Sequence, residues 1–192
     1  MQLTALSLLA SVASVSAAAL TPKDTNELFE NKFTLVAERR GAPFDGQFVT
    51  ASKSSLRLLV PSEKRDAQCT KGSGDQPAVL IRKHHELFLY NSDEDFPQQL
   101  AVNTLAENPN NLKYFSHLNN VPDHGNWETM GWDIGRQSRI QFYDRPWVAC
   151  QEPDGTYKVG VAWKKTIDSS CLTIRLLPEH QYYATKCQYS EE

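Results

Sequence analysis

The cysteines are the residues of this chain whose chemistry is easiest to assign. The four are Cys69, Cys150, Cys171 and Cys187. A zinc thiolate site requires C-x₂₋₄-C spacing, which no pair here has. An even number of cysteines in an oxidising compartment instead indicates two disulfides, for which three pairings are possible. The short separation favours Cys150–Cys171, and Cys69–Cys187 would then join the C-terminus to the first third of the chain.

The other reactive residue types form no catalytic or metal-binding pattern. Gly72-Ser73-Gly74 lies in a polar run and is not a nucleophile elbow. His85-Glu86 lacks the second histidine of a zinc-binding helix motif. Asp93-Glu94-Asp95 falls where a hairpin is expected to turn, which favours solvated carboxylates over a glycosidase pair. The sequence therefore predicts no catalytic residue, no metal site and no cofactor.

Aromatic side chains are the remaining candidates for binding. An indole face can stack on a sugar ring, although tryptophans of small β-domains usually lie in the core. Trp127 follows Gly125-Asn126 in an Asn- and Pro-rich stretch, 103–128, and is our first candidate for ligand contact. Loops of this length in a compact domain are often functional. Tyr114, in the same stretch, and Trp132, in an expected strand where a core position is favoured, are further candidates.

The elements that must position these residues are short strands. Runs such as 33–37, 87–90, 157–163 and 171–177 are rich in apolar, β-branched and aromatic residues and are separated by turn formers, which predicts an all-β domain. Ile81–Tyr90 and Ile134–Tyr143 both read as strand, polar turn and strand ending in tyrosine, with a fainter copy at 53–58. Three such units predict a single compact β-barrel of the β-trefoil type. A β-sandwich is the alternative.

The N-terminus predicts secretion. Met1–Ala19 is an uncharged apolar run that ends in small residues, as a signal peptide does, and it is too short to span a bilayer. Residues 20–32 then form an N-terminal extension, and 33–190 a single all-β domain. No hydrophobic tail follows Cys187, so we expect no membrane anchor. The dibasic pair Lys64-Arg65 is a candidate cleavage site for a secretory-pathway protease.

Charge excludes one class of partner. The chain carries a net charge of −3, and its basic residues are dispersed along it, some of them in pairs such as Arg39-Arg40 and Lys164-Lys165. Nucleic-acid binding requires a clustered basic face, so no nucleic-acid partner is expected.

Several motifs together resemble the fungal cell wall proteins of the PhiA (phialide-development) family, which includes secreted IgE-binding and elicitor-like proteins. The resemblance rests on residues spread over the mature chain: Arg39-Arg40-Gly41-Ala42-Pro43, Asp66-Ala67-Gln68-Cys69, Leu87-Phe88-Leu89-Tyr90, Gln98-Gln99, Gly131-Trp132, Ala149-Cys150, Trp163, Cys171 and Cys187-Gln188-Tyr189-Ser190. All four cysteines have a counterpart. The chain departs from the family at His84-His85-Glu86, at the 103–128 stretch and at Gln151.

The resemblance implies a non-catalytic secreted protein in the fungal cell wall, with a part in wall organisation and in conidiophore and phialide development. Its expected partners are wall polysaccharide or a wall protein. Two alternatives stay open: an apoplastic effector or elicitor that binds a host defence protein, and a lectin-like module that uses Trp127 or Trp132.

Overall fold

The computed structural model describes residues 32–91, 97–107, 109–116, 121–122, 124–135, 139–164 and 167–191. The predicted signal peptide, the acidic run 93–95 and nearly all of the 20–32 extension lie outside these ranges. The described elements are β1 (Phe33–Glu38), β2 (Thr50–Ser52), β3 (Ser55–Leu58), the 3₁₀ turn η2 (Ser62–Lys64), β4 (Gln68–Cys69), β5 (Val79–Lys83), β6 (Glu86–Leu89), β7 (Gln99–Asn103), β8 (Leu112–Phe115), β9 (Trp127–Glu128), β10 (Trp132–Gly135), β11 (Arg139–Phe142), β12 (Trp147–Gln151), β13 (Tyr157–Val161), β14 (Cys171–His180) and β15 (Cys187–Gln188).

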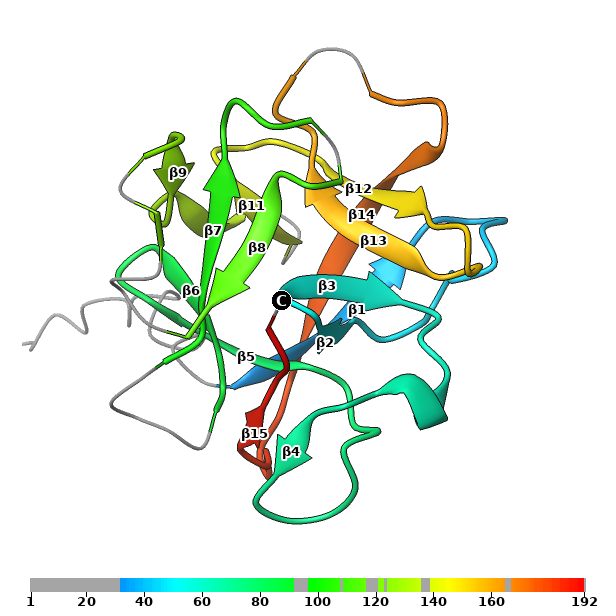
Figure 1. Ribbon diagram of the computed structural model, residues 1–192, viewed down its shortest axis with the longest axis vertical. Helices are drawn as coiled ribbons and strands as arrows, with labels where there is room; N and C mark the ends of the chain where they lie inside the picture. Colours follow the sequence, from blue (N-terminus) through cyan, green and yellow to red (C-terminus); the bar gives the residue numbers. More distant parts are fainter. Residues whose placement is uncertain are drawn as a thin grey trace, which may run out of the picture.

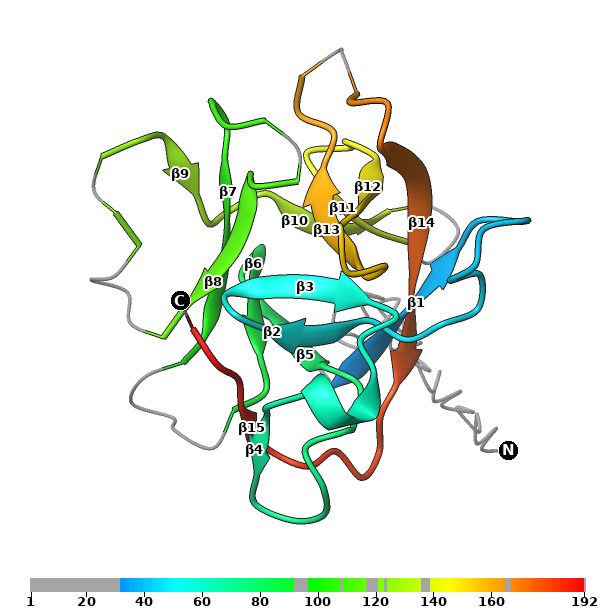
Figure 2. The same cartoon turned by 45° about the vertical axis from the view of Figure 1, so that its right-hand side comes forward.

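One large antiparallel sheet organises the domain. Its eleven strands run in the order β2-β3-β13-β12-β14-β1-β5-β6-β7-β8, and β9 pairs with β7. The longest strand, β14, pairs with β12 through its first half and with β1 through its second, from Glu38↔Arg175 to Phe33↔His180. The sheet curls as a half-barrel around the core (Figure 1), and a second view shows β14 and β1 crossing beside the β2–β3 hairpin (Figure 2).

The two ends of the curled sheet approach each other through β8. The Tyr114 amide donates to the Ser54 carbonyl at 3.1 Å. The buried Asn111 side chain accepts from the Val161 amide at 3.2 Å and donates back to the Val161 carbonyl. A side-chain amide thus substitutes for a missing pair of ladder hydrogen bonds between β8 and β13.

Tight turns connect several of these strands. Lys53-Ser54 joins β2 to β3 and His84-His85 joins β5 to β6, with positive φ at all four residues. Two successive positive φ values define the type I′ turn, whose twist matches that of the flanking strands. The three sequence units at 53–58, 81–90 and 134–143 correspond to β2–β3, β5–β6 and β10–β11. The first two lie in the large sheet, whereas β10 and β11 form a separate two-stranded sheet.

Aromatic rings fill the centre of the core. Trp132 stacks on Trp147 with ring centroids 5.4 Å apart and packs against Phe142 at 4.7 Å. The Trp147 indole N–H donates to the Ile140 carbonyl at 2.7 Å, which satisfies its polar atom within the core.

The structure contains the disulfides Cys69–Cys187 and Cys150–Cys171, the pairing that the sequence favoured. The first joins β4 to β15, which form a small sheet at one end of the domain (Figure 1), and the second joins β12 to β14. The prediction of an all-β domain with two disulfides is confirmed. The β-trefoil and β-sandwich assignments are not confirmed, because a single curled sheet carries most of the strands. Among the described residues, no helix has the length and apolar character needed to cross a membrane.

Candidate functional site

Two of the three aromatic candidates lie in the core. Trp132 and Tyr114 are fully buried, so neither ring offers a face to a ligand in this structure. The Tyr114 hydroxyl donates to the Ser190 carbonyl at 2.6 Å, which ties β8 to the C-terminal segment. Burial, reinforced by the carboxylates of Asp66 and Glu191, raises the pKa of Tyr114 above its usual range. Both residues therefore have positions that stabilise the fold.

Trp127 is only partly buried, and local backbone geometry holds it at the surface. It begins β9, opposite Asn103 of β7. Gly125 and Asn126 before it both have positive φ, at 104° and 58°, which reverses the chain just ahead of the indole. The Asn126 carbonyl accepts from the Thr104 amide at 3.0 Å, and the Trp127 ring meets Phe115 edge to face at 5.1 Å.

A polar hollow of about 440 Å³ opens beside this indole. Its walls come from β6, β7 and the segment around β9, and they combine the Trp127 ring with carboxylate, amide and hydroxyl groups: Glu86, Gln99, Asn126 and Thr129. A concave surface with one aromatic face and a few fixed polar groups suits a ligand that has both apolar and hydroxylated sides.

Glu86 and Gln99 form the fixed polar centre of this hollow. The Gln99 Nε2 donates to Glu86 Oε1 at 2.7 Å, and the Thr129 hydroxyl donates to the same oxygen at 3.3 Å. This contact sets the orientation of the Gln99 amide, because the opposite orientation would place two acceptor oxygens together. Gln99 is fully buried, and its Oε1 has no partner within the protein. A buried acceptor of this kind is costly unless a ligand hydroxyl or water donates to it.

Neither Glu86 nor Gln99 was predicted as a site residue from the sequence. The available signal was the pair Gln98-Gln99 at the start of the otherwise apolar run 100–102. Side chains of adjacent strand residues point to opposite faces. The Gln98 amide pairs with the backbone of Tyr189 at 2.7 and 2.9 Å, whereas Gln99 faces the hollow.

The described residues contain no group of three or more histidine, cysteine or acidic side chains able to hold a metal ion. The dibasic pair Lys64-Arg65 lies at the end of η2. The Arg65 guanidinium donates to the carbonyls of Val60, at 2.9 Å, and Asp75, so the candidate cleavage site is folded back on its own loop.

Comparisons with known proteins agree with this picture of a secreted domain. The family model described as PhiA-like secreted protein matches residues 33–190. The chain is 26% identical over 196 aligned residues to the cell wall protein phiA of Aspergillus fumigatus, with both chains covered over their full length. The protein of the same name from strain CBS 144.89 / FGSC A1163 / CEA10 matches equally well. No solved structure matches the chain.

These matches confirm the predicted family resemblance and the secreted, cell wall localisation. The family match extends over the whole all-β domain, from the first residue of β1 to two residues beyond β15. The chain belongs to the PhiA-like secreted protein family.

Proposed function

We propose that this protein is a non-catalytic component of the fungal cell wall that contacts wall polysaccharide through the hollow beside Trp127. The observation that carries the proposal is the combination of a partly exposed indole with carboxylate, amide and hydroxyl groups, those of Glu86, Asn126 and Thr129, in one polar hollow. The ring packs on the C–H face of a sugar, and the polar groups around the ring form hydrogen bonds with the sugar hydroxyls. A role in phialide and conidiophore development would follow from this place in the wall.

The relatives support the wall as the site of action. The protein to which this chain is similar over its full length is named a cell wall protein. The disulfides and the buried core give the domain the stability that an extracellular protein requires. The Glu86 carboxylate, already held by two hydrogen bonds, has an orienting role here and needs no catalytic one.

The test is a pull-down of the purified mature protein on washed fungal wall, chitin and β-glucan, with the bound and free fractions measured. We expect retention on the wall and on one of the two polymers. Trp127→Ala should weaken retention roughly tenfold, which corresponds to about 1.4 kcal/mol. Thr129→Val keeps the side-chain shape and removes the donor to Glu86. It should weaken retention less than Trp127→Ala does.

Trp163→Ala is the matched control, because Trp163 is also partly buried and lies away from the hollow. It should leave retention unchanged once both variants are shown to be folded. Complete recovery of the wild-type protein in the free fraction would overturn direct wall binding and favour a soluble effector with a protein target. If Trp127→Ala and Trp163→Ala lowered retention equally, the hollow would not be the contact site.

A further inference from the structure

A second hollow opens at the turn between β11 and β12, and we call it the Tyr143 hollow. It has a volume of about 350 Å³, and its lining residues are His85, Met130, Gly131, Asp133, Tyr143 and Asp144. No described residue lines both this hollow and the one beside Trp127. The proposed polysaccharide contact therefore leaves the Tyr143 hollow unassigned.

The turn places Tyr143 at a position that does not favour a tyrosine. The φ values of Tyr143 and Asp144 are 45° and 57°, and the Arg145 amide donates to the Phe142 carbonyl at 2.9 Å. This is a type I′ turn, whose first position favours asparagine or glycine. A bulky residue with positive φ has a conformational cost, and such strained residues are concentrated at functional sites.

The backbone of Gly131 supports one side of the Tyr143 ring. The Tyr143 amide donates to the Gly131 carbonyl at 2.9 Å, and a Cβ atom at position 131 would overlap the ring. Phe142 meets the same ring edge to face, with centroids 4.9 Å apart. Tyr143 is nevertheless 52% exposed. The ring is therefore held from one side and open on the other, as a platform for stacking must be.

Two carboxylates lie beside this ring. Asp144 follows Tyr143 directly in the turn and is exposed. Asp133 Oδ1 accepts a hydrogen bond from the Ile134 amide at 2.8 Å and lies 3.5 Å from Nη1 of Arg82. Arg82 is buried, so a ligand in the hollow meets the carboxylate and not the guanidinium. Carboxylate oxygens are strong acceptors for hydroxyl groups.

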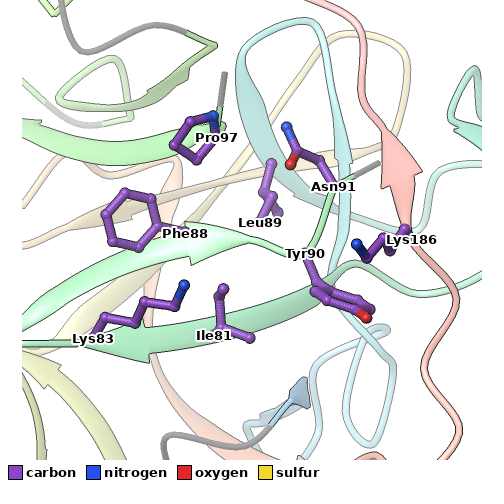
Figure 3. Close-up of a pocket in the computed structure, with 8 residues that line it drawn as sticks. All are labelled: Ile81, Lys83, Phe88, Leu89, Tyr90, Asn91, Pro97 and Lys186. Atoms are coloured by element: carbon purple, nitrogen blue, oxygen red, sulfur yellow. The ribbon is translucent and has the colours of Figure 1, made fainter. Parts of the chain in front are cut away.

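The lysine at the end of β5 lies on another face. The Lys83 side chain extends over the outer face of the β5–β6 hairpin, beside Ile81 and Phe88 (Figure 3). Among the described residues, the lining of the Tyr143 hollow includes no lysine or arginine. An aromatic face with hydrogen-bond acceptors beside it suits a ligand rich in hydroxyl groups, as does the hollow beside Trp127.

The two hollows lie on opposite sides of one chain segment. Thr129 lines the Trp127 hollow, and Met130, the next residue, lines the Tyr143 hollow. Met130 forms an antiparallel bridge with Glu86, so the chain is extended here. Consecutive side chains of an extended segment point in opposite directions. Two sugar chains can therefore approach the domain from different sides.

We propose that the Tyr143 hollow is a second sugar-binding site, through which one domain bridges two polysaccharide chains. This inference rests on the proposed function, because the first chain contacts the hollow beside Trp127. A phenol ring offers less stacking area than an indole, so the Tyr143 hollow is the weaker site. Bridging gives a non-catalytic protein a direct part in the organisation of a wall.

The test is agglutination of beads coated with chitin or with β-glucan, by mature protein that size-exclusion chromatography shows to be monomeric. We expect the wild type to agglutinate the beads whose polymer retains it. Tyr143→Asn, which places a favoured residue in the turn and is expected to fold, should need at least about tenfold more protein for agglutination. Its retention on the same polymer should fall by no more than about twofold. Tyr143→Phe keeps the ring and should agglutinate as the wild type does.

Tyr182→Ala is the matched control, because Tyr182 is 81% exposed and lines neither hollow. It should leave agglutination unchanged, whereas Trp127→Ala should abolish it by removing the stronger site. Retention of the wild type without agglutination would overturn bridging and leave the Trp127 contact standing. Undiminished agglutination by Tyr143→Asn would also overturn it, because the chains would then be joined in another way. Failure of the wild type to be retained at all would overturn both proposals.

Discussion

Cys69 and Cys187 are directly opposite each other in the β4–β15 ladder, although 118 residues separate them in the sequence. Their disulfide therefore closes a loop that contains most of the domain. Cys150 and Cys171 are also directly opposite in the β12–β14 ladder, but only 21 residues separate them.

The two disulfides should contribute unequally to stability. By the loop-entropy relation, the longer loop corresponds to about 5 kcal/mol and the shorter one to about 3 kcal/mol. We expect Cys69→Ala/Cys187→Ala to lower the free energy of unfolding by more than Cys150→Ala/Cys171→Ala does. Urea unfolding of the two double variants measures the difference, and a larger loss in the Cys150/Cys171 variant would contradict the loop-length argument.

Replacement of Trp132 should lower the stability of the domain much more than replacement of Trp127 does. Trp132→Ala removes a fully buried ring from the stack with Trp147 and should cost about 3–5 kcal/mol of unfolding free energy. Trp127→Ala removes a partly buried ring at the surface and should cost less than about 1.5 kcal/mol. Chemical denaturation of both variants checks the ranking, and equal costs would show that Trp127 is a core residue.

Asn111 should be the side chain on which closure of the curled sheet depends. Asn111→Ala leaves the buried amide of Val161 unpaired, whereas the Val161 carbonyl keeps its hydrogen bond from the Trp163 amide, so the expected cost is about 1–3 kcal/mol. The neighbouring Asn110 is exposed and accepts a hydrogen bond from Lys158, so Asn110→Ala is the matched control and should cost less than about 1 kcal/mol. Similar unfolding free energies for the two variants would show that β8 is held by other contacts.

Stability should fall in alkaline solution because of buried tyrosines. Burial raises the pKa of Tyr189 to about 12, above its ordinary value of 10.0. Between these values the unfolded chain releases the proton and the folded chain retains it. The free energy of unfolding should therefore decline as pH rises through this window, by about 1.4 kcal/mol per pH unit for this residue. Below about pH 10 this contribution to stability is fully present.

Tyr189→Phe tests this expectation, because the ring stays and the titrating group is removed. The variant loses the hydrogen bond from the Val79 amide, at 3.3 Å, and should be less stable than wild type near neutral pH. Its decline in stability above about pH 10 should nevertheless be shallower, as measured by urea unfolding at a series of pH values. An unchanged slope would mean that Tyr189 ionises equally in both states. Tyr114, whose pKa is also raised, contributes in the same direction.

The class of the domain and its two disulfides could be predicted from the sequence alone. Short apolar runs separated by turn formers are a local signal, and they correctly indicated strands at β1, β5, β6, β13 and β14. The even number of well-separated cysteines indicated two disulfides, and the family resemblance placed the chain among secreted wall proteins. Each of these inferences depends on residue type and short-range spacing, which a single sequence contains.

The order in which the strands pair, and which side chains reach the surface, could not be predicted from the sequence because both depend on long-range contacts. The hairpins at 53–58, 81–90 and 134–143 look alike locally, yet β2–β3 and β5–β6 join the large sheet and β10–β11 does not. Strand order depends on long-range pairing, as between β1 and β14, which local periodicity does not encode. Likewise, Trp127 and Trp132 are five residues apart in the sequence, and their difference in burial follows from the ring stack with Trp147. The meeting of Glu86 with Gln99 in one hollow has the same cause, because β6 and β7 become neighbours only when the sheet forms.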